Sequence, residues 1–150
     1  MTLDDIQHSI YQGQKGLEQA FKLVEAYIKK KKEDIPEVNR ALRMAKRKLD
    51  SIPVGILNQI SVTEKYRNYF KNILPEGKIY NTEAEGLKLL DKVREDLNQR
   101  ILDAKEPSTK RNREYEKTEV TKFFRNNFAN IVNILELYNL LHDIKIEINK

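Results

Sequence analysis

The sequence predicts an all-α fold, a single bundle of five or six helices that spans residues 1–150. Five Gly and four Pro are few breaks for 150 residues, and the segments between them repeat apolar residues at steps of three or four, the period of a helix. A chain of this length suits one domain with a proper core. Its hydrophobic share of 39% and charged share of 34% predict a soluble protein with large exposed faces.

Composition also excludes several classes of function. The chain has no Cys, which removes disulfides, thiolate nucleophiles and Cys-based zinc sites, and agrees with a reducing cytoplasm. No apolar run approaches the ~18 residues of a membrane span. The acidic start MTLDDIQHSI lacks the pattern of an export signal. We therefore expect a cytoplasmic protein with no membrane contact.

The first quarter of the chain predicts two helices. The first runs to about Lys30, and Gly13 lies on its apolar stripe, where we expect a kink or a close helix–helix contact. Pro36 lies in the first turn of the second helix. The two stripes consist of Ile6, Ile10, Leu17, Phe21, Val24 and Ile28, and of Val38, Leu42, Ala45 and Leu49. Another face of the second helix is basic and comprises Arg40, Arg43 and Arg47, flanked by Lys46 and Lys48.

Three helices are predicted in the middle of the chain. A short one covers Pro53–Ile60, a second begins at a Ser61–Glu64 capping box and runs to about Leu74, and a third runs from Thr82, capped with Glu85, to about Ala104. The expected inward residues of the second are Val62, Tyr66, Tyr69, Phe70 and Ile73. Those of the third are Leu87, Leu90, Val93, Leu97 and Ile101.

The last third, Ser108 to about His142, predicts one long helix around which the core assembles. It contains no Pro or Gly, and Pro107 stops whatever precedes it, so that Ser108 or Thr109 can serve as N-cap. Its apolar stripe is Val120, Phe124, Phe128, Ile131, Leu135, Tyr138 and Leu141. Before Val120 the helix is almost wholly polar. Residues 144–150 alternate without an evident partner and are expected to be a frayed helix end or a disordered tail.

Positive charge is concentrated in two segments. Lys29–Lys48 holds nine Lys/Arg against three Asp/Glu, a net +6, and Ser108–Arg125 holds six against three, a net +3. Clustered cations attract phosphates, so two such segments folded onto one side would form a groove for a nucleic-acid backbone. The alternative is that both are solvated faces that keep the protein in solution.

Aromatic and amide side chains add a second indication. Tyr66, Tyr69 and Phe70 alternate with cations, and Phe123 and Phe124 lie between two more, an arrangement that holds single strands by stacking. Phe123 and Tyr69 are the stacking candidates, although all these rings also have core spacing. The Asn residues of the last helix are Asn126, Asn127, Asn130 and Asn133; Asn130 and Asn133 could bind a partner backbone or a phosphate, or simply face solvent.

Catalytic patterns are absent from the sequence. His142-Asp143 spells a dipeptide of metal-dependent phosphohydrolases, but such sites need further ligands that His8 alone cannot supply. The adjacent carboxylates Glu95-Asp96 diverge by about 100° on a helix, and the glycines form no phosphate loop. We expect a protein that acts by binding, with no enzymatic activity, cofactor or metal.

The stretch STKRNRE followed by TKFFRNNFA, within residues 108–135, resembles the closing helices of CRISPR effector subunits. These are the small all-helical belly subunit of Cascade-type complexes and the C-terminal helical part of the type I-D large subunit. The resemblance implies a non-enzymatic small subunit of a crRNA-guided complex, which packs against other subunits and copies of itself and touches crRNA only indirectly. It implies backbone contact with target or displaced DNA, because base pairing reads the sequence in such complexes. The contact residues would be Arg40, Arg43, Lys46 and Arg47, with Lys110, Arg111 and Arg113.

A different class of function is also open. In a helical interaction protein, such as an antitoxin, an immunity protein or an adaptor, the apolar stripe around Phe123–Leu141 would continue onto a protein partner and the basic faces would be incidental. A free-standing DNA-binding regulator is less favoured, because no helix–turn–recognition-helix pattern stands out.

Overall fold

The computed structural model describes residues 3–31, 35–75 and 77–150, and every regular element in these ranges is helical. The prediction of an all-α fold is confirmed. The described residues form seven α-helices and one 3-10 helix, where five or six helices were predicted. The elements are η1 (Leu3–Gln12), α1 (Gly13–Lys30), α2 (Pro36–Asp50), α3 (Val54–Val62), α4 (Glu64–Ile73), α5 (Thr82–Leu102), α6 (Pro107–Asn126) and α7 (Phe128–Ile148).

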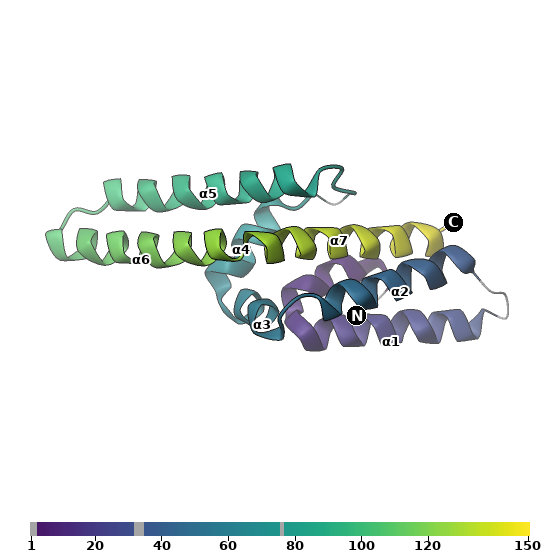
Figure 1. Cartoon of the computed structure of the whole chain (residues 1–150). Coiled ribbons are helices and arrows are strands. Elements are labelled where there is room, and N and C mark those ends of the chain that lie inside the picture. Colours follow the sequence, from purple (N-terminus) through teal and green to yellow (C-terminus); the bar gives the residue numbers. More distant parts are fainter. Residues whose placement is uncertain (1–2, 32–34, 76) are drawn as a thin grey trace.

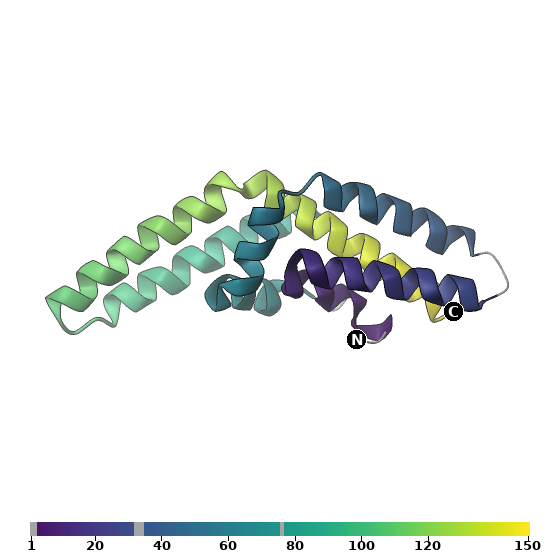
Figure 2. The same cartoon turned by 90° about the horizontal axis from the view of Figure 1, so that it is seen from below.

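The molecule is elongated, with a bundle at one end and a helical hairpin at the other (Figure 1). In the bundle, α7 lies against η1 and α2, and α1 packs on the far side of η1. The hairpin, which we call the arm, consists of α5 and α6. Helix α5 leads away from the bundle, and α6 returns towards it alongside α5. The short helices α3 and α4 lie where the arm meets the bundle (Figure 2). No helix in the described ranges is long and apolar enough to cross a membrane.

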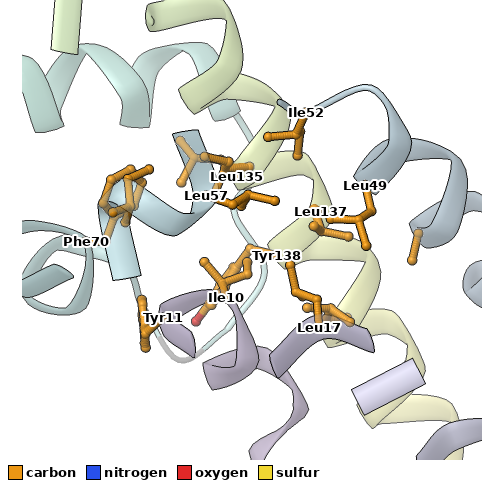
Figure 3. Packing of buried hydrophobic residues seen from close by; sticks show 14 of the residues in the cluster. Ile10, Tyr11, Leu17, Leu49, Ile52, Leu57, Phe70, Leu135, Leu137 and Tyr138 are labelled. Atoms are coloured by element: carbon orange, nitrogen blue, oxygen red, sulfur yellow. The ribbon is translucent and has the colours of Figure 1, made fainter. Parts of the chain in front are cut away.

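Helix α7 is the centre of the core. Eight of its residues are buried, and α2, η1 and α5 pack against it; Figure 3 shows Leu135, Leu137 and Tyr138 among the buried residues. Because neighbours cover α7 on several sides, its burial exceeds the single stripe that the sequence predicted. The eight residues are Ile131, Ile134, Leu135, Leu137, Tyr138, Leu141, Ile144 and Ile148.

The expectation of a frayed tail at residues 144–150 is wrong for most of the segment. Helix α7 continues to Ile148, and both Ile144 and Ile148 are buried. The Tyr27 hydroxyl of α1 also donates to the Ile148 carbonyl oxygen at 3.4 Å. The alternating apolar residues of this segment therefore belong to the last turns of α7, and their packing partners come from other parts of the chain.

The predicted long helix is two helices, α6 and α7, which meet at an angle at Asn127 (Figure 2). The Asn127 side chain donates to the Phe123 carbonyl oxygen at 2.9 Å and accepts from the Asn130 amide at 3.2 Å. Asn side chains compete in this way with regular helical bonding. This break adds one helix to the predicted number.

Gly13 forms the joint between η1 and α1. Its φ of +77° is a left-handed conformation that favours glycine. A Cβ atom built there would lie 2.8 Å from Ser61 Oγ and 3.0 Å from Asn58 Oδ1 of α3. Both expected roles of Gly13, the kink and the close contact, are confirmed.

Three details of the middle helices differ from prediction. Val62 is 77% exposed, because α3 continues to Val62 and α4 begins only at Glu64, so the Ser61–Glu64 box does not form. Asn81 caps α5 by accepting from the Ala84 backbone amide at 3.0 Å, in place of Thr82. The buried face of α5 carries Gly86, Leu89, Val93 and Leu97, whereas the predicted Leu87 is 51% exposed. The side chain of Ile73 lies outside what the structure describes.

Candidate nucleic-acid interface

The clearest basic surface is a row of arginines on α2. Val38, Ala41, Leu42, Ala45 and Leu49 turn the opposite face of this helix into the core, which places Arg40, Arg43 and Arg47 in solvent. These three arginines, at positions i, i+3 and i+7, form no ion pair with any residue that the structure describes. We call them the α2 arginine row.

Two other predicted contact residues bind within the chain. Lys46 pairs with Glu25 of α1 and thereby joins two helices of the bundle. Arg113 donates to the Arg100 carbonyl oxygen near the end of α5 and so fastens the arm. Lys110 and Arg111, at the head of α6, are exposed and have no ion-pair partner among the described residues.

The two basic segments do not form one groove. Helix α2, which carries the arginine row, lies in the bundle, whereas the start of α6, which includes Lys110 and Arg111, lies at the far tip of the arm in both views (Figures 1 and 2). The arm extends away from α2 because α6 packs along α5 up to the break at Asn127. A ligand that contacts both the α2 arginine row and the start of α6 must span the long axis of the molecule.

The aromatic stacking candidates are occupied by one another. Phe123 stacks on Tyr66 with ring centroids 4.5 Å apart, and Tyr69 meets Phe124 edge to face at 6.1 Å. This cluster joins α4 to α6 at the base of the arm. Burial, followed by the charges of Glu119 and Glu116, raises the pKa of the Tyr66 phenol. Burial, followed by Asp96, raises the pKa of Tyr69. The rings serve the fold, and the structure offers neither Phe123 nor Tyr69 as an open stacking platform.

The amides of α7 are likewise bonded internally. Asn130 donates to Asn127 at 3.2 Å, and Asn133 accepts from Lys48 of α2 at 3.4 Å. Lys48 also pairs with Glu136, which fixes α2 against α7. Among the four Asn residues predicted in the last helix, Asn126 is the exception: it lies at the end of α6, is exposed and lines a cleft of the arm.

That cleft lies between α5 and α6 and has a volume of about 910 Å³. Its cations belong to the basic segment Ser108–Arg125, but they were not among the contact residues predicted from the sequence. The cleft could be identified only once α6 was seen to pack beside α5, because α5 provides the opposite wall. The cleft is lined by Asn98, Ile101 and Leu102 from α5, and by Glu114, Lys117, Thr118, Thr121, Lys122, Arg125 and Asn126 from α6.

A second groove, of about 420 Å³, lies between α2, α7 and the segment before α5, and its lining mixes apolar with charged side chains. Met44, Tyr80 and Ile146 line it and are all exposed, Tyr80 to 95%. Arg40 stands in its wall, and Lys78 at its rim pairs with Asp143 at 3.3 Å. We call it the Tyr80 groove.

The His142-Asp143 dipeptide belongs to the same region. His142 Nδ1 lies 3.5 Å from Gln7 Oε1, and Asp143 is held by Lys78. Within residues 3–31, 35–75 and 77–150, no three His, Cys, Asp or Glu side chains converge as metal ligands. The dipeptide is thus part of a polar contact between α7, η1 and the segment before α5.

Comparison with known proteins identifies one family. A family model described as "Family of unknown function (DUF6267)" matches residues 5–150, so this chain belongs to that family. No curated protein and no solved structure matches the chain.

Proposed function

We propose that this protein is a non-enzymatic nucleic-acid-binding protein that contacts a sugar–phosphate backbone through the α2 arginine row. One observation carries the proposal. Arg40, Arg43 and Arg47 remain exposed and unpaired within the described chain, whereas Lys46 and Lys48 of the same helix bind carboxylates. Guanidinium groups bind phosphate in a bidentate manner, and a row on one helix face needs no base-reading motif.

Charge reversal tests the proposal. A variant with Arg40→Glu, Arg43→Glu and Arg47→Glu should fold as the wild type does, by circular dichroism, and should lose affinity for labelled DNA. Loss of three phosphate contacts should lower the slope of log affinity against log salt by about 2.7 for duplex DNA, at ~0.9 per contact.

The control variant carries Lys15→Glu, Lys22→Glu and Lys71→Glu, three exposed cations of α1 and α4, and changes the net charge by the same amount. It should retain most of the affinity. Equal losses in both variants would mean that binding follows net charge alone, and retained binding in the arginine variant would remove the α2 row from the interface.

The finer proposal, a small subunit of a crRNA-guided CRISPR complex, is supported by the resemblance of residues 108–135. Affinity purification of the tagged protein from its native host, with sequencing of co-purified RNA and mass spectrometry, tests it. Repeat–spacer RNA together with Cas subunits is the expected result. A single protein partner without RNA would contradict it.

A protein-interaction module is the second candidate, and the Tyr80 groove favours it. Tyr and Met are enriched in the buried centres of protein interfaces, and Tyr80 is nearly fully exposed beside Met44 and Ile146. If this candidate is right, Tyr80→Ala should release the co-purified protein partner, whereas Arg43→Glu with Arg47→Glu should retain it.

A further inference from the structure

We infer that the cleft between α5 and α6 is a binding site for single-stranded nucleic acid. The inference rests on the proposed function, to which it adds a second contact surface and a class of ligand. It depends on four properties of the cleft: the direction in which its cations point, their lack of ion pairs, their spacing, and the apolar wall opposite them.

The cations of the cleft lie on the side of α6 that the fold does not use. Glu116, Val120 and Phe123, at i, i+4 and i+7, face α4 and the core. Thr118, Lys122 and Arg125 repeat the same spacing two residues later, and two residues correspond to about 200° around a helix. The binding face therefore points away from the face that holds the arm to the bundle.

These cations are also unpaired. Lys117, Lys122 and Arg125 line the cleft with one carboxylate, Glu114, and none of the three forms an ion pair within the described chain. Structural pairing in the arm is concentrated on Glu116, which accepts from both Lys65 and Arg100. The positive charge of the cleft is thus available to an anionic ligand.

The spacing suits a chain of phosphates. Lys117 and Arg125 are eight residues apart, about 12 Å along the helix axis at 1.5 Å per residue. Phosphates of one strand follow one another every ~3.4 Å of axis in duplex form, so these cations reach more than one of them. Lys110 lies two turns before Lys117 on nearly the same side and extends the row towards the tip of the arm.

The opposite wall favours a single strand over a duplex. Ile101 and Leu102 of α5 line the cleft, and Leu102 is 77% exposed. A duplex presents phosphates outward and keeps its bases stacked inside, so it would leave this apolar wall uncovered, whereas a single strand can cover it with sugar and base surface. Asn98, Asn126 and Thr118 add neutral hydrogen-bonding groups, and the buried Thr121 Oγ1 has no hydrogen-bond partner in the described chain.

The test measures fluorescence anisotropy of labelled oligothymidylate, oligouridylate of the same length, and a DNA duplex. In a variant with Lys117→Ala, Lys122→Ala and Arg125→Ala, three lost contacts should lower the salt slope for single strands by about 2, at ~0.7 per contact. Affinity at 0.1 M salt should then fall about 100-fold. The two single-stranded probes distinguish DNA from RNA, and the duplex should bind less tightly than either to the wild type.

The outcomes separate this inference from the proposed function. Loss of binding in the α2 arginine variant alone would overturn the cleft and keep the proposed function. Loss in the cleft variant alone would support the cleft and overturn the role of the arginine row. If the wild type binds none of the three probes, both fail.

A second measurement maps the site directly. A photo-crosslinking amino acid at Leu102 should form adducts with oligothymidylate, and the same group at Val54, an exposed position of α3, should not. Crosslinking at Val54 but not at Leu102 would overturn the inference even if the cation variants lose affinity.

Discussion

At the scale of single residues, Gly13 shows how one position sets the course of the chain. Its left-handed φ turns η1 into α1, and its missing side chain lets α3 approach. The approach brings Asn58 Oδ1 within 3.4 Å of the Gln14 backbone amide, which donates to it at the start of α1. Gly13 therefore meets a conformational requirement and a packing requirement together.

Gly13→Ala should lower the free energy of unfolding by about 2 kcal/mol, because Ala is disfavoured at positive φ and its Cβ would collide with α3. Urea denaturation measures the change. Gly55→Ala is the matched control: Gly55 lies in α3 with no atom within 4 Å of an added Cβ, so the free energy of unfolding should rise by about 0.5 kcal/mol. A Gly13 variant as stable as the wild type would refute both requirements.

Tyr11 makes stability depend on alkaline pH. Burial, and then the neighbouring Tyr138, raise the pKa of Tyr11 above the usual value near 10. Below pH 10 the phenol is protonated in both states and contributes no slope. Above pH 10 the unfolded chain loses the proton first, so the free energy of unfolding falls as pH rises towards the folded pKa.

Tyr11→Phe should therefore flatten the decline of stability above pH 10 and leave the pH dependence between 7 and 9 unchanged. Chemical denaturation at a series of pH values checks this. Some decline should remain in the variant, because the pKa values of Tyr66 and Tyr69 are raised as well. Parallel curves for wild type and variant above pH 10 would show that Tyr11 does not contribute.

The candidate site was predictable from sequence only in part, and single cations show why. Helical spacing placed Arg40, Arg43 and Arg47 on one exposed face of α2, as the structure does. The spacing could not show that Lys46 meets Glu25, because that contact depends on how α1 and α2 pack. Residue types and periods locate a basic face, but tertiary packing decides which of its cations remain unpaired.

At the scale of elements, the joint between arm and bundle depends on Glu116. Its carboxylate accepts from Lys65 of α4 and Arg100 of α5, so three helices meet at one half-buried group. The aromatic cluster of Tyr66, Phe123 and Phe124 lies beside it. Removal of the Glu116 carboxylate leaves two cations without a partner, whereas removal of one member of a simple surface pair leaves only one.

Glu116→Ala should reduce the free energy of unfolding by about 1 kcal/mol. Glu114→Ala, at an exposed position on the other side of α6 with no described ion pair, should change it by less than about 0.5 kcal/mol. A double-mutant cycle with Arg100→Ala should give a nonzero coupling energy for Glu116. Additive effects would show that the ion pair contributes nothing.

The elements were predictable where the apolar period was long and local. The stripes of α1, α2 and the last third identified most buried positions correctly. The break at Asn127 was not predicted, because the presence of an Asn in a helical pattern does not indicate which backbone carbonyl its side chain will bind. The face of α5 was misplaced at Leu87 because Gly86, which lets Phe128 approach, carries no apolar side chain to mark it.

At the scale of the whole molecule, the elongated shape of the protein changes the interpretation of its two basic segments. The sequence shows two basic segments, but only the arrangement of helices shows that the bundle carries one and the arm the other (Figure 1). Periodicity cannot supply this, because it fixes which face of a helix is apolar and not where the helix points. A nucleic acid that contacts both surfaces follows the long axis of the protein.

The bundle is closed by the end of α7, which leads to the last prediction. Ile144 has no exposed surface, whereas Ile146, two residues later in the same turn, is 45% exposed. Ile144→Ala should lower the free energy of unfolding by about 3 kcal/mol through lost burial and an unfilled cavity. Ile146→Ala should change it by less than about 0.5 kcal/mol. A frayed tail would make both substitutions silent in urea denaturation, so the difference between two isoleucines shows whether this segment completes the core.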